Sequence, residues 1–177
     1  MKRRWSRVLS GLLALALSIS LLLVGVSADT LFVDNPHWSE VSAQTVTQMY
    51  NNSESFVVMF FRYGCFNSNL RKVMLSEWMT EYDLDVYGVD VDTYNMPSWV
   101  WAKLGGGSVI LPVICIIENG QAECFTALDS MRSINKRLQE FLGVYDGTEI
   151  GFSQLNAEIY NAYSTDASVA ASQYCLS

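Results

Sequence analysis

Apolar residues are spaced differently in successive segments of this 177-residue chain. Residues 56–61 (FVVMFF) form an unbroken apolar run, which is typical of a central strand buried on both faces of a sheet. Apolar residues then recur at positions 70, 73, 74 and 78, the spacing of an amphipathic helix. The pattern predicts a strand that leads into a helix, with the nonapeptide FRYGCFNSN (61–69) at their junction.

The same reasoning predicts the remaining elements. Strands are expected at 31–33, 84–91, 109–117 and 122–126, and helices over 38–49, 99–104 and 128–141. Asp34-Asn35-Pro36 is a turn or helix-start signal, and Asp129 and Gly143 are expected to cap and end the last of these helices. Apolar positions 152, 155, 159 and 163 predict one more helix in a C-terminal tail.

The order of these elements indicates the fold class. Strands that alternate with helices pair in parallel, whereas a hairpin adds an antiparallel pair. The order β-α-β-α-β-α-β-β-α therefore predicts an α/β fold, a central mixed sheet with helices on both faces, followed by a C-terminal helical tail. We expect a domain at 29–143 and an extension at 144–177 that is partly helical and then flexible.

A hairpin is predicted at Asn119-Gly120, because these residues tolerate the positive φ angles of a two-residue turn. Counting outward from this turn places Cys115 opposite Cys124, on a rung where Cα atoms approach to about 4.5 Å. A cross-strand disulfide fits that separation only at its short end. The alternative is two small apolar residues packed side by side, and a bulge would shift the register.

The N-terminus is typical of an export signal. Four basic residues precede an apolar stretch at 9–26, and Val26-Ser27-Ala28 offers a signal-peptidase site. We expect residues 1–28 to be a cleaved signal peptide and the protein to be extracytoplasmic, either secreted or on the outer face of the membrane. The alternative is an uncleaved membrane anchor, since the apolar stretch could just span a bilayer.

Charge excludes one class of partner. Removing residues 1–28, which hold four basic and no acidic side chains, takes the net charge from −7 to about −11. Nucleic-acid binding needs positive charge, so we expect no nucleic-acid partner. His37 is the single histidine, and the sequence has no Cys/His cluster that suggests a metal; we expect neither a metal nor a cofactor.

Three features together resemble the thioredoxin superfamily. The segment VVMFFRYGCFNS runs from a strand through Cys65 into a helix, and LPVICIIENG joins Pro112 to a strand and an Asn-Gly hairpin. The third feature is the element order over 31–143. The resemblance implies a thioredoxin-like fold, in which Cys65 is the attacking cysteine and Pro112 is a cis-proline beside it that holds a substrate backbone.

The resemblance also implies that Leu111, Tyr63 and Phe66 contact the substrate, which would be a protein or peptide thiol or disulfide. Several positions depart from the family pattern. Ser68 stands in place of the resolving cysteine, Tyr63-Gly64 replaces the usual tryptophan, and Met59 falls where thioredoxins bury an acidic residue.

A thiolate is the attacking species, and the start of a helix stabilises one through unpaired N–H groups and the helix dipole. We expect Ser68 to donate a hydrogen bond to the sulfur of Cys65, with Arg62 close by. A site with one cysteine can form mixed disulfides that an external thiol releases, so the expected activity is monothiol or isomerase-type thiol–disulfide exchange.

Two alternatives remain open from the sequence. Cys65 could be an inert thiol that serves packing. The protein would then be a non-catalytic binding or chaperone-like module, for example an accessory to the export of a disulfide-containing peptide. Cys175, close to the C-terminus, could reach Cys65 or cross-link two chains, and the sequence does not choose between these.

Overall fold

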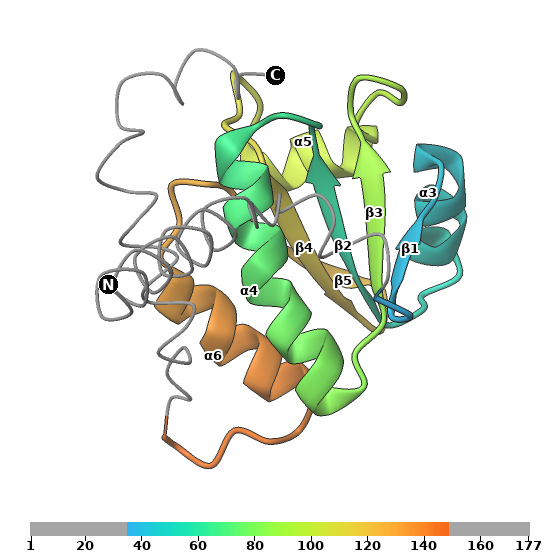
Figure 1. Ribbon diagram of the computed structural model, residues 1–177. Coiled ribbons are helices and arrows are strands. Elements are labelled where there is room, and N and C mark those ends of the chain that lie inside the picture. The colour runs from blue at the N-terminus through green and yellow to red at the C-terminus, as the bar shows by residue number, and fades with distance from the viewer. Residues whose placement is uncertain (1–34, 149–177) are drawn as a thin grey trace, which may run out of the picture.

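The computed structural model describes residues 35–148. The elements, with the labels of Figure 1, are β1 (Trp38–Glu40), α3 (Ala43–Asn51), β2 (Phe56–Phe61), α4 (Phe66–Tyr82), β3 (Val86–Asp90), α5 (Ser98–Leu104), β4 (Val113–Glu118), β5 (Gln121–Phe125) and α6 (Met131–Phe141). Within the described residues their order is the predicted alternation of strands and helices, ending in a hairpin and a helix.

The strands form one sheet in the order β1-β3-β2-β4-β5. The β1–β3 and β2–β3 pairs are parallel, and the β2–β4 and β4–β5 pairs are antiparallel. Helices α4 and α6 cover one face of this sheet, and α3 and α5 cover the other (Figure 1). This mixed, two-sided arrangement confirms the predicted α/β, thioredoxin-like fold.

Strand β2 lies at the centre of the sheet, and all six of its residues are buried. Its side chains alternate between two apolar clusters: Val57, Met59 and Phe61 face α4 and α6, whereas Val58 and Phe60 face α3 and α5. The continuous apolar run predicted this burial, because a strand covered on both faces has no polar side.

The first predicted helix was wrong at its start. Residues 38–40 form strand β1, and the helix begins only at Ala43. The Ser42 side chain caps it by accepting the N–H of Thr45. Pairing with β3 decides the strand, since the Val86 N–H donates to the His37 carbonyl at 2.8 Å. The strand predicted at 31–33 lies outside the described residues.

Close approach of Trp38 to β3 explains the glycine in that strand. A Cβ atom built on Gly88 would overlap the Trp38 ring. Trp38 also meets the Phe61 ring edge-on, with centroids 5.6 Å apart. The Trp38 side chain therefore extends from a strand and packs on the sheet face that α4 covers, whereas the sequence had placed it on a helix.

The predicted cap of the last helix was also wrong. Helix α6 begins at Met131, and Ser130 caps it by accepting the N–H of Ser133 at 3.1 Å. The carboxylate of Asp129 is instead engaged by the N–H of Thr126 at 2.6 Å. Leu128, which was expected on the apolar face of the helix, lies before it with 78% of its surface exposed.

The hairpin has the predicted register. Asn119 and Gly120 take φ angles of 50° and 75°, and Glu118, Ile117, Ile116 and Cys115 face Gln121, Ala122, Glu123 and Cys124 in turn. Positive φ at both turn residues matches the right-handed twist of the strands, which is why Asn-Gly specifies this connection.

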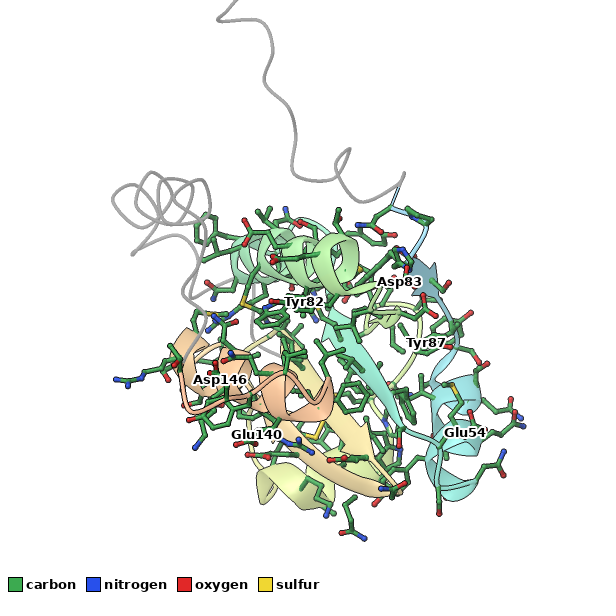
Figure 2. All side chains as sticks on the ribbon, turned by 90° about the horizontal axis from the view of Figure 1, so that it is seen from below. Glu54, Tyr82, Asp83, Tyr87, Glu140 and Asp146 are labelled. Atoms are coloured by element: carbon green, nitrogen blue, oxygen red, sulfur yellow. A yellow bond between two sulfur atoms is a disulfide. The ribbon has the colours of Figure 1, made fainter. Side chains whose placement is uncertain are left out.

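Several acidic side chains lie at the end of the sheet away from the start of α4. Asp83 is the C-cap residue of α4, Glu54 precedes β2 and Glu140 lies near the end of α6; Figure 2 views the molecule from this side. No helix among residues 35–148 is long and apolar enough to cross a membrane. The segments expected to be a signal peptide, 1–28, and a tail helix, 152–163, lie outside the described residues.

Candidate functional site

Cys65 lies in the short turn that joins the end of β2 to the start of α4. Its N–H donates to the carbonyl of Arg62 at 3.2 Å, and Gly64 takes a φ of 72°. Cys65 itself is the N-cap residue of the 17-residue helix, in an extended conformation with φ −74° and ψ 119°. The sequence placed the cysteine at this junction, and the structure gives it the capping position.

The sulfur of Cys65 takes the part that a capping oxygen plays in other helices. The main-chain N–H of Ser68 points to Sγ, with a nitrogen–sulfur distance of 3.4 Å. The first turn of α4 contains no acidic residue. An N–H donor and the positive end of a helix dipole both favour a negative charge on this sulfur whenever it is released as a thiolate.

The donor is not the one predicted from the sequence. The Ser68 Oγ accepts the N–H of Arg62 at 3.3 Å, and its backbone N–H is the group that points to the sulfur. The Arg62 side chain is held by Asp92, with Nε and Oδ1 2.8 Å apart. Ser68 is fully buried and acts on the sulfur through its backbone, while its side chain braces the turn that precedes Cys65.

Cys65 is oxidised in this structure. It is disulfide-bonded, and no described cysteine is free. The residue has no exposed surface and belongs to the apolar cluster on the α3–α5 face. The sulfur thus occurs in a bond that another thiolate can attack.

Leu111 and Pro112 lie beside this sulfur. The Leu111 carbonyl oxygen is 3.9 Å from Sγ of Cys65, and both Leu111 and Pro112 are buried. A disulfide sulfur has no proton to donate, so this is a contact rather than a hydrogen bond in the oxidised state. The Leu111–Pro112 peptide bond is cis. The fold therefore brings the Leu111–Pro112 segment next to Cys65 and Ser68, although Leu111 lies 46 residues beyond Cys65 in the sequence.

Tyr63 is the most exposed of the predicted contact residues, with 52% of its surface accessible. Its hydroxyl donates to Oε1 of Glu40 at 2.6 Å, and its ring meets Phe61 edge-on at 5.1 Å between centroids. Phe66, the first residue of α4, is half-buried. Tyr63 thus offers an aromatic surface next to Cys65, held in place from two sides.

Lys72 is a feature of this region that sequence reasoning missed. Only 2% of it is exposed, and its Nζ lies 3.8 Å from the centroid of Phe61, 5.0 Å from that of Tyr63 and 5.2 Å from that of Trp38. A cation placed over aromatic rings is attracted by their negative faces. Its position two turns beyond Cys65 on α4 could have indicated that it lies near the site. It was missed because a lysine in an amphipathic helix usually reaches solvent.

The position where the resemblance expects an acidic residue is apolar. Met59 is fully buried, faces Gly88 on one neighbouring strand and Ile114 on the other, and belongs to the cluster under α4 and α6. Residue 59 therefore supplies no carboxylate that could carry protons to or from Cys65.

Cys115 and Cys124 form a disulfide across the hairpin, with Cα atoms 4.1 Å apart. Cys115 is fully buried, and Cys124 packs against the same apolar cluster that contains Cys65. The sequence left open whether this pair was bonded or merely packed. Because both sulfurs are used here, neither is available to Cys65 in this state.

No family model matches the chain, and no curated protein matches it. Among solved structures, oxidised thioredoxin O2 from Arabidopsis thaliana is 20% identical, with a TM-score of 0.44 over 59% of this chain and 92% of that one. A Schistosoma mansoni thioredoxin pre-protein is 19% identical, with a TM-score of 0.44 over 59% and 97%. A Fasciola hepatica thioredoxin is 16% identical, with a TM-score of 0.43 over 58% and 98%.

Likenesses of this size carry no inference about activity. The fold assignment rests on the strand order, the strand directions and the placement of helices on both faces of the sheet. These features establish a thioredoxin-like α/β fold for residues 35–148, and they leave its chemistry to be argued from Cys65 and its surroundings.

Proposed function

We propose that this protein exchanges thiols and disulfides with protein or peptide partners through Cys65, outside the cytoplasm. The observation that carries the proposal is the placement of this sulfur. It caps α4, accepts the N–H of Ser68 and lies beside Leu111, while already taking part in a disulfide. A sulfur kept only for packing needs no helix terminus directed at it.

The exchange itself is a displacement at sulfur. The Cys65 thiolate attacks one sulfur of a substrate disulfide, a new S–S bond forms, and the other substrate sulfur leaves as a thiolate. Ser68 has no thiol with which to expel the bound substrate. An external thiol, or a second thiolate of the substrate, must therefore release Cys65, which makes the reaction monothiol or isomerase-type.

The location follows from the N-terminal segment. A basic start, an apolar stretch and a small-residue site support export, and export brings four cysteines into oxidising surroundings. Membrane attachment belongs to the proposal only if residues 1–28 remain uncleaved.

A second candidate function is a non-catalytic binding module, for example an accessory to the export of a disulfide-containing peptide. Two observations favour it: Cys65 has no exposed surface, and the neighbouring Tyr63 has 52% of its surface exposed. Aromatic side chains at a surface suit peptide contacts.

Comparison of the reduced full chain with its Cys65→Ser variant separates the two functions. We expect the unsubstituted protein to speed the refolding of a protein with scrambled disulfides, and the variant to fall to the background rate. The double variant Cys115→Ala/Cys124→Ala is the matched control, because it also removes one disulfide of the chain, but one that lies away from the start of α4. Equal refolding rates for the Cys65→Ser variant and the unsubstituted protein would leave only the binding module.

A further inference from the structure

Lys72 is a buried cation whose place the proposed exchange at Cys65 leaves unexplained. Among the described residues only two charged side chains are buried, those of Arg71 and Lys72. Arg71 donates to the carbonyls of Ala127 and Asp129, at 3.2 and 2.8 Å, and so ties α4 to the segment before α6. Lysine is seldom buried to this extent, because taking a charge out of water is costly. The burial of Lys72 is therefore a specific feature of this chain.

The three rings around the Lys72 ammonium group come from elements that meet near Cys65. Trp38 lies on β1, Phe61 ends β2, and Tyr63 follows in the turn that leads to α4. Phe61 meets both of the other rings edge-on, with centroids 5.6 Å from Trp38 and 5.1 Å from Tyr63. Side chains of a helix lean toward its N-terminus, so Lys72 reaches back toward the start of α4. Its Nζ thus lies 3.8 to 5.2 Å from all three ring centroids.

Tyr63 is held in place although half of its surface is exposed. Its hydroxyl donates to Oε1 of Glu40 at 2.6 Å, and the same oxygen accepts the Nε1 of Trp38 at 3.4 Å. Its ring is also restrained by Phe61 and by the Lys72 ammonium group, which lies 5.0 Å from its centroid. An exposed side chain usually keeps its rotamer freedom until a ligand binds. Tyr63 is ordered beforehand by groups from β1, β2 and α4.

We propose that Lys72 is a positioning residue. Together with the Glu40 carboxylate, its ammonium group holds the Tyr63 ring as a preformed contact surface for an apolar side chain of the peptide substrate, next to the cysteine that Cys65 attacks. This inference rests on the proposed exchange at Cys65 and deepens it, because it names the residues that select among peptides.

The charges around Tyr63 favour an apolar side chain in this place. A cationic side chain on the ring would be repelled by Lys72, and an anionic one by Glu40. An apolar side chain meets neither repulsion, and it buries surface against the ring. Because the ring is already ordered, binding does not cost its rotamer freedom.

Two synthetic peptides measure this selection. Each has one cysteine joined to thionitrobenzoate, and the residues on both sides of that cysteine are leucine in one peptide and glycine in the other. The Cys65 thiolate of the reduced full chain attacks the peptide sulfur, a disulfide between Cys65 and the peptide forms, and the coloured thionitrobenzoate leaves as a thiolate. The Cys65→Ser variant gives the background from the other three thiols, of which that of Cys175 lies outside the described residues.

The quantity compared is the ratio of the two second-order rate constants, leucine peptide over glycine peptide. We expect Lys72→Met to lower this ratio about two- to tenfold, the factor that corresponds to ordering one side chain on binding. Lys136→Met is the matched control, because it also removes a lysine that lies over a ring, that of Tyr145 at 5.5 Å, and it should leave the ratio unchanged. An unchanged ratio in Lys72→Met would overturn the proposal.

A double-mutant cycle shows whether Lys72 acts through Tyr63. Tyr63→Ala should itself lower the ratio, and adding Lys72→Met to it should change the ratio no further. If Lys72→Met lowers the ratio equally with and without Tyr63, the positioning role is wrong.

Glu40→Ala tests the same surface at an exposed position, and its result decides the proposal if Lys72→Met does not fold. It should lower the ratio in the same direction, because it removes the acceptor of the Tyr63 hydroxyl. A ratio equal to that of the unsubstituted protein would contradict a preformed Tyr63 surface.

The ratio also separates this inference from other causes and from the proposed function. Loss of structure, or weaker stabilisation of the Cys65 thiolate, slows both peptides and leaves their ratio unchanged. If Cys65 reacts but the ratio depends on neither Lys72 nor Tyr63, the inference fails and the exchange function stands. If the unsubstituted protein reacts no faster than Cys65→Ser with either peptide, the proposed function itself fails.

Discussion

Ser68 lies next to Cys65 as the sequence predicted, but the atom that contacts the sulfur is its backbone nitrogen. The sequence put a hydroxyl one turn from Cys65, where it could donate to the sulfur. In the structure the backbone N–H makes that contact, and the hydroxyl accepts from Arg62. The sulfur's hydrogen bond therefore does not depend on the side chain that replaced the resolving cysteine.

Tyr82 gives a pH-dependent prediction at the same scale. Burial, with the neighbouring Glu81 as the lesser cause, raises the pKa of its phenol above the ordinary value of 10.0. Tyr82, which Figure 2 labels, is the last residue of α4. Its ring stacks on that of Trp78 with centroids 4.9 Å apart. Folding thus favours the neutral phenol over the phenolate.

The sign of the effect follows from proton binding. Above pH 10 the unfolded chain releases the Tyr82 proton more readily than the folded one, so the free energy of unfolding falls as pH rises through the folded pKa. We expect urea unfolding at several alkaline pH values to show this fall, and the Tyr82→Phe variant to show a shallower one. An identical slope in both proteins would contradict the prediction.

At the scale of elements, the β4–β5 hairpin is held by its turn and by a disulfide. The turn sets the register, and the register brings Cys115 and Cys124 face to face. The bond closes a loop with a sequence separation of nine residues. In the chain-entropy account, a crosslink stabilises the fold by restricting the unfolded chain.

Removing this bond should lower the free energy of unfolding by about 2–3 kcal/mol, the chain-entropy value for a loop of this length. The measurement is urea unfolding of Cys115→Ala/Cys124→Ala in a Cys65→Ser background, compared with Cys65→Ser alone, so that only the hairpin bond differs. Adding a reductant should remove most of the difference. A difference that persists unchanged under reductant would assign it to lost packing instead.

At the scale of the whole molecule, β2 joins two apolar clusters into one structure. Phe60 lies in the cluster under α3 and α5, and Phe61 lies in the cluster under α4 and α6. Both are fully buried, although they are adjacent in sequence. Because the sheet is covered on both faces, neither half has a core of its own that is independent of this strand.

We therefore expect Phe60→Ala and Phe61→Ala each to cost about 3–5 kcal/mol, the range for removing a buried aromatic ring. Unfolding in urea should remain a single transition in each variant. Leu128→Ala is the control, because that side chain is 78% exposed and should change stability by no more than about 0.5 kcal/mol. Two separate transitions, or damage from only one of the two phenylalanines, would show that the faces unfold independently.

The sequence by itself determined the features that depend on neighbouring residues. The burial of β2, the register of the Asn119-Gly120 hairpin and the place of Cys65 between a strand and a helix follow from patterns that act over a few positions: the apolar run, the turn residues and the helical spacing. These were enough to indicate the fold class and to single out Cys65 and the Cys115–Cys124 pair, whereas the role expected for Pro112 came from the resemblance to the thioredoxin superfamily.

Only the tertiary structure decided the rest, because distant partners compete with local preference. Trp38 joined a strand since β3, far along the chain, offered it hydrogen bonds and a glycine to lie over. Lys72 is buried because three aromatic rings from other elements surround its ammonium group. The helix start likewise directs the backbone N–H of Ser68 at the sulfur of Cys65, while the Ser68 hydroxyl accepts the N–H of Arg62. Interactions between neighbouring residues determined where the strands, the turn and the helix start lie. Packing between segments far apart in the sequence determined which side chains contact one another.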